Sequence, residues 1–174
     1  MASSPSWRSR AVAGMVGVLI VVLLAVSAPA AGGVKPPRRP FVATNGLFAR
    51  AKLGAYCVTY ERDGRGVGVC MAAAAPDQPP KPRIRVEPGD RFTMLFRHRQ
   101  GLHDRPTRLH ASLGRIEDGD LETLSAHVKA HRVRGHPRKW RARAPSEAPQ
   151  ANVLELFETF PAGDASYFVG LRQA

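Results

Sequence analysis

Beyond residue 41, apolar and polar residues alternate in short runs. Alternation with a period of two is typical of strands that bury one face. Residues 151–160 (ANVLELFETF) are apolar on both faces, which predicts a central strand, with a short helix as the alternative. The positions expected to face the core are Ile84, Val86, Phe92, Met94, Phe96, Leu109, Ala111, Leu113, Tyr167, Val169 and Leu171.

The segments between these runs carry turn residues. In residues 87–90 (EPGD), Pro and Gly occupy the positions that a type II turn requires. Only residues 120–129 have helical spacing, with Leu121, Leu124 and Val128 three and four positions apart. The pattern predicts an all-β fold, an immunoglobulin-like or cupredoxin-like β-sandwich of seven to nine strands. A small barrel is the alternative, because periodicity does not separate the two.

The first 30 residues have the layout of an export signal. Arg8 and Arg10 precede an apolar run at residues 11–26, and Ala-Pro-Ala at residues 28–30 fits a cleavage box. We therefore expect an N-terminal apolar signal helix. The expected organisation is a signal peptide at residues 1–30, a Pro/Arg-rich linker at residues 31–40 and a β-sandwich domain at residues 41–174.

The alternative is that the apolar segment is retained as a membrane anchor. Residues 11–31 carry no charge and reach the roughly 20 residues needed to span a bilayer. In both cases the domain is exported. The expected localisation is secreted or extracytoplasmic, with a single-pass membrane protein anchored by residues 11–31 as the alternative.

The only two cysteines, Cys57 and Cys70, flank an Asp-Gly pair at residues 63–64. Asp-Gly between strand-like runs is a strong hairpin signal, because a type I′ turn needs positive φ at both central residues. With Asp-Gly as the turn, the cysteines face each other at a non-hydrogen-bonded pair, where side chains approach closely. We expect a Cys57–Cys70 disulfide, because structural zinc needs more ligands and export favours oxidation. The same register places on one apolar face, which we expect to line the core, Val58, Tyr60, Val67 and Val69.

This region also resembles a group of small exported bacterial envelope proteins. The motifs are GAYC at residues 54–57, VC at residues 69–70 and VEPGD at residues 86–90. They are similar to a G-S-Y-C-W … V-C-A-D framework found in β-rich, disulfide-stapled proteins of unknown function, and the resemblance covers residues 54–96. The resemblance implies a fold and a compartment, and no activity. The chain departs from the framework at Ala55, Val58 and Met71.

The formal net charge is +12 at pH 7. A surface this basic attracts polyanions, so the expected partners are anionic lipid headgroups, wall polymers or acidic polysaccharides. GC-rich coding, which enriches Arg, is the alternative origin of the charge. Nucleic acid is not expected, because no recognition motif is present in this exported chain. No feature specifies an oligomeric state.

Residues 129–143 (KAHRVRGHPRKWRAR) concentrate this charge and contain no acidic residue. Val133, Trp140 and Ala142 alternate with charged residues, which predicts two strands joined at residues 135–137. The alternative interpretation is that Trp140 packs inward while the arginines form a solvated face. The candidate anion-binding residues are Arg132, Arg134, Arg138, Lys139, Trp140, Arg141 and Arg143.

No motif for catalysis or cofactor binding is present. His127 and His131 lie among arginines, which repel a cation, and residues 116–122 (IEDGDLE) lack the spacing of a calcium loop. Ser112 lacks the first glycine of a G-x-S-x-G elbow. We expect no metal, no cofactor and no catalytic residue, and a non-enzymatic binding or structural module at the cell envelope. A small secreted hydrolase is the alternative.

The export signal makes a testable prediction. The exported protein should begin at Ala31 or Gly32, because cleavage follows the small-residue box. Intact-mass measurement of secreted material tests this start site. A cell-bound form that retains residues 1–30 would show a membrane anchor instead.

Overall fold

The structure, a computed structural model, describes residues 36–62, 64–96, 106–125 and 127–172. These residues form twelve strands, one 3-10 helix and no α-helix, so the predicted all-β class is confirmed. The strand number exceeds the seven to nine expected, since the sequence pattern assigned no strand to residues 41–50 and gave residues 120–125 helical spacing, whereas both segments form strands. The strands are β1 (Phe41–Thr44), β2 (Leu47–Arg50), β3 (Lys52–Arg62), β4 (Arg65–Met71), β5 (Ile84–Arg85), β6 (Arg91–Leu95), β7 (Arg108–Glu117), β8 (Asp120–Ser125), β9 (His131–Val133), β10 (His136–Arg143), β11 (Val153–Phe160) and β12 (Gly163–Arg172), and the 3-10 helix is η2 (Ala148–Gln150).

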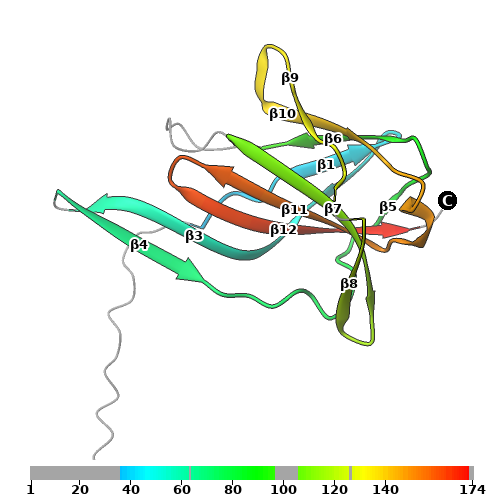
Figure 1. The fold of residues 1–174 in the computed structure, drawn as a ribbon, viewed down its shortest axis with the longest axis horizontal. Coiled ribbons are helices and arrows are strands. Elements are labelled where there is room, and N and C mark those ends of the chain that lie inside the picture. The colour runs from blue at the N-terminus through cyan, green and yellow to red at the C-terminus, as the bar shows by residue number, and fades with distance from the viewer. Residues whose placement is uncertain (1–35, 63, 97–105, 126, 173–174) are drawn as a thin grey trace, which may run out of the picture. The chain divides into compact units, whose positions relative to one another are not determined.

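The strands form two sheets (Figure 1). The five-stranded sheet has the order β2-β1-β6-β10-β9, and all its strand pairs are antiparallel. The seven-stranded sheet has the order β4-β3-β12-β11-β7-β8. Its seventh strand, β5, pairs in parallel with the end of β12, beyond the last residue that β3 pairs with.

The two sheets pack around one apolar core. The five-stranded sheet contributes Val42, Phe92 and Met94, and the seven-stranded sheet contributes Leu154 and Tyr167, each 0% exposed. Every position that the alternation assigned to the core is buried. Because each large apolar side chain contributes about 1.5–3 kcal/mol on burial, this shared core is the main source of stability.

Residues 120–125 of the segment with helical spacing form the strand β8, and residues 127–129 belong to no helix, so the prediction of helical character was wrong. β8 forms a hairpin with β7 around a turn at Asp118 and Gly119, whose φ angles are 52° and 89°. The pairing continues past β8, where the Val128 amide donates to the Ala111 carbonyl at 2.8 Å. The Asp-Gly turn and the neighbouring strand therefore override the spacing of the apolar residues.

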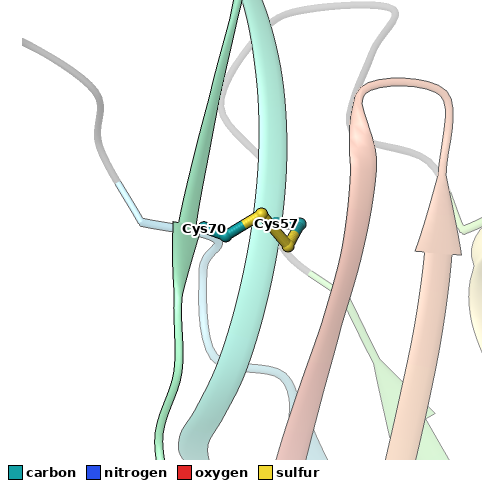
Figure 2. The surroundings of a disulfide bond; sticks show 2 residues. All are labelled: Cys57 and Cys70. Atoms are coloured by element: carbon teal, nitrogen blue, oxygen red, sulfur yellow. A yellow bond between two sulfur atoms is a disulfide. The ribbon is translucent and has the colours of Figure 1, made fainter.

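The β3–β4 hairpin has the predicted register. Cys57 lies opposite Cys70, and the two are joined by a disulfide (Figure 2). Gly64 has the positive φ, 71°, that the turn requires, while Asp63 lies outside the described residues. Gly163 of β12 allows close packing here, because a Cβ at that position would lie 1.9 Å from the carbonyl oxygen of Cys57. The disulfide therefore joins the edge strand β4 to a strand held tightly in the sheet.

The apolar face of this hairpin is only partly buried. β12 pairs with β3 as far as Val58, and the hairpin extends past that point (Figure 1). Val58 packs against the core, whereas Tyr60, Val67 and Val69 are half-buried. The expectation that all four residues line the core is therefore correct only for the base of the hairpin.

The predicted signal peptide and the first half of the predicted linker lie outside the described residues. Residues 36–40 belong to no strand, and β1 begins at Phe41. The described part of the chain contains no helix with the length and hydropathy to cross a membrane. The disulfide indicates an extracytoplasmic location, because such bonds persist in oxidising compartments.

The disulfide makes a prediction about stability. The double variant Cys57→Ser/Cys70→Ser should lose about 3 kcal/mol of unfolding free energy, because the unfolded chain loses a constraint on a short loop. Denaturant unfolding measures the loss, and reduced parent protein is the control that should match the variant. Equal stability of the variant and the oxidised parent would contradict the prediction.

Candidate anion-binding face

Strand geometry places the candidate residues at 132–143 on different sides of the five-stranded sheet. Along β10, Lys139, Arg141 and Arg143 pair with Leu95, Thr93 and Arg91 on the outer face of the five-stranded sheet, the face turned away from the core. The alternating positions Trp140 and Ala142 are buried and pair with Met94 and Phe92 of the core. The segment thus presents three of its cations on one surface.

The other candidates lie elsewhere. Arg134 is exposed in the turn between β9 and β10. Arg138 precedes Lys139 on the core-facing side, at the end of the sandwich where its carbonyl accepts from the Phe96 amide at 2.9 Å. Arg132 pairs opposite Trp140, and its guanidinium lies 5.2 Å from the centre of the Trp140 ring.

Trp140 is a core residue at the sheet margin. Its side chain is 7% exposed, and Arg132 covers it while donating to the carbonyl of Pro106. A cation over an indole face is attracted by the ring quadrupole. Trp140 therefore belongs to the packed interior, as in the second interpretation of the sequence, and it is not available to a ligand on the outer face.

Residues from other strands complete the outer face. The register aligns one row across four strands, Arg50–Phe41–Leu95–Lys139, and a second row beside it, Phe48–Ala43–Thr93–Arg141. His131 of β9 continues the second row beyond Arg141. We refer to these two rows, with His131, Arg91 and Arg143, as the basic face.

The five-stranded sheet contains no carboxylate. Its Lys and Arg residues are Arg50, Arg91, Arg132, Arg138, Lys139, Arg141 and Arg143. The seven-stranded sheet has as many acidic as basic residues. Its acidic residues are Glu61, Glu117, Asp120, Glu122, Glu155, Glu158 and Asp164, and its basic residues are Lys52, Arg62, Arg65, Arg85, Arg108, Arg115 and Arg172. The net positive charge of the strands therefore comes from the five-stranded sheet.

The cations of the basic face have no carboxylate partners within the described ranges. Arg50 instead lies over the Phe41 ring, 5.9 Å from its centre. The Nε of Arg141 is buried without a hydrogen-bond acceptor among the described residues. Like charges held together without counter-charges repel, and an anionic ligand removes that repulsion.

The basic face also has an apolar part. A shallow hollow of about 440 Å³ is lined by Phe41, Ala43, Phe48, Thr93, Leu95 and Lys139. Phe48 is 70% exposed, unusual for so large an apolar side chain. Sequence reasoning missed this part, because it comes from β1, β2 and β6, far from residues 129–143. The available signal was Asn45-Gly46, a type I′ hairpin pair with φ angles of 47° and 77°.

Two other polar regions have structural explanations. A hollow of about 600 Å³ at one end of the seven-stranded sheet is lined in part by Arg115, Gln150 and Asn152. Arg115 donates to the Gln150 carbonyl at 3.2 Å, and the Asn152 amide bonds both backbone groups of Ile116, at 2.7 and 2.9 Å. These groups fasten η2 and its flanks to β7.

The buried carboxylate Glu158 accepts a hydrogen bond from the Tyr167 hydroxyl at 2.9 Å. Glu158 lies on β11, and Tyr167 lies on the adjacent strand β12. Among the described residues, no group of three or more potential ligands could hold a metal ion. The basic face therefore remains the feature with the clearest chemistry.

Comparison of the chain with protein-family models, curated proteins and solved structures found no match.

The position of Trp140 predicts a specific stability effect. Trp140→Ala should lower the unfolding free energy by about 3–5 kcal/mol, because it leaves a cavity in the core. Lys139→Ala, the neighbouring change on the outer face, should alter it by less than about 1 kcal/mol. Denaturant unfolding compares the two variants. A Trp140→Ala protein as stable as the Lys139→Ala protein would place the indole outside the core.

Proposed function

We propose that this protein is an exported, non-enzymatic module that binds polyanions at the cell envelope through the basic face. One observation carries the proposal: the basic face holds five Lys or Arg residues, Arg50, Arg91, Lys139, Arg141 and Arg143, and the strands of its sheet contain no Asp or Glu. An exposed surface of one sign attracts counter-charged partners over distances near the Debye length, about 8 Å at physiological salt. The extracytoplasmic location indicated by the disulfide is consistent with envelope partners.

We also propose that the fold belongs to the immunoglobulin-like or cupredoxin-like sandwiches, and that the chain is related to the envelope proteins resembled by residues 54–96. Two antiparallel sheets around one core support the first point. The Cys57–Cys70 bridge across a hairpin agrees with the disulfide-stapled character implied by the second. Neither relationship specifies an activity, so the proposed function rests on the surface chemistry alone.

The proposal predicts binding to a soluble polyanion. The parent domain should bind dextran sulfate, with affinity that decreases steeply as salt is raised. The triple variant Lys139→Ser/Arg141→Ser/Arg143→Ser should bind roughly tenfold more weakly, because each exposed charge pair contributes about 0.5 kcal/mol. Calorimetry over a salt series measures both effects.

The matched control is Lys52→Ser/Arg65→Ser/Arg108→Ser, which removes the same net charge from exposed positions of the seven-stranded sheet. This control should bind nearly as well as the parent domain. Equal losses in the two triple variants would show that overall charge, rather than the basic face, governs binding. Absence of dextran sulfate binding by the parent domain would reject the proposed function.

A further inference from the structure

The basic face combines a cationic part with an apolar part. Its β10 side carries Lys139 and Arg141, and its β1–β2 side carries Phe41 and Phe48 around the apolar hollow. The described residues include no carboxylate on any strand of this sheet. Exposed apolar patches bordered by polar groups are typical of binding surfaces, because exposure of a ring such as that of Phe48 to water is unfavourable.

The chemistry of this surface selects an amphiphilic anion. Its charged side chains are hydrogen-bond donors, and Thr93 contributes a hydroxyl group to the lining of the hollow. A hydrophilic polyanion would neutralise the cations but leave Phe48 in water. A phospholipid surface supplies both partners, with phosphates for Lys139 and Arg141 and the glycerol and acyl region for the apolar hollow.

We propose that the basic face docks on an anionic phospholipid bilayer, with Phe48 inserted at the boundary between headgroups and acyl chains. This inference rests on the proposed function and names its partner. Interfacial binding increases with buried apolar area and with electrostatic attraction to anionic lipid, and this face provides both. The lysine stem can lie along apolar surface while its amine reaches a phosphate.

The hairpin that carries Phe48 is well suited to insertion. The Asn45-Gly46 turn is tight, and the Asn45 side chain donates to Asp90 Oδ2 at 2.7 Å. Asp90 also accepts from the Glu87 amide at 2.8 Å, so the β1–β2 turn is fastened to the turn before β6. A ring held on a fastened hairpin loses little conformational freedom on binding, which favours association.

Vesicle binding tests the inference. The parent domain should bind vesicles of phosphatidylglycerol and phosphatidylcholine, and should not bind vesicles of phosphatidylcholine alone. Phe48→Ala should weaken binding to the anionic vesicles roughly tenfold, because an apolar ring no longer leaves water. Its binding to dextran sulfate and its thermal midpoint should stay unchanged. Phe157→Ala is the matched control, because Phe157 is 42% exposed on the outer face of the other sheet.

A second variant reports insertion directly. The tryptophan emission of Phe48→Trp should shift to the blue on addition of anionic vesicles and stay unchanged with dextran sulfate, because only the lipid surface offers an apolar phase. Dextran sulfate binding without vesicle binding would overturn the lipid assignment and leave the proposed function intact. Equal vesicle affinities of Phe48→Ala and the parent domain would overturn insertion. Failure of the parent domain to bind dextran sulfate would reject the proposed function itself.

Discussion

Burial of one face of the five-stranded sheet against the seven-stranded sheet determines the arrangement of the rest of the molecule. Side chains alternate across a strand, so fixing Phe92, Met94 and Trp140 in the core forces their neighbours outward. A shift of one residue in β10 would place Lys139 and Arg141 in the core, at a prohibitive desolvation cost. The outward positions of the cations are thus a consequence of core packing.

Core packing does not restrict which residues occupy the outer face of each sheet, and the two outer faces differ in composition. The outer side of the seven-stranded sheet has a small apolar cluster that includes Ile116, Val153 and Phe168, against which Ala75 of the β4–β5 connection packs. The five-stranded sheet instead exposes Phe48, the most exposed large apolar side chain among the described residues, and its strands carry cations and no carboxylate. Neither feature helps the fold, because exposed rings and repelling charges are unfavourable in water. A binding role for this face explains both.

Local signals in the sequence predicted the parts of the structure that depend on neighbouring residues. The Asp-Gly turn set the register of Cys57 and Cys70, and alternation identified the core positions. Local signals could not predict the basic face, because long-range strand pairing brings Arg50 and Phe41 beside Lys139. Alternation separates Trp140 from its charged neighbours, but it does not say which side meets the core until the partner sheet is known. Hydrophobic spacing failed at β8, where pairing with β7 decided the conformation.

Mapping of backbone amide shifts by NMR tests the central claim most directly. Titration of the ¹⁵N-labelled domain with bicelles that contain phosphatidylglycerol should perturb the amides of β1, β2, β6 and β10 and leave β7, β8 and β11 unchanged. Bicelles of phosphatidylcholine alone should produce no such pattern. Perturbations centred on the seven-stranded sheet, or spread evenly over both sheets, would contradict a binding role for the basic face.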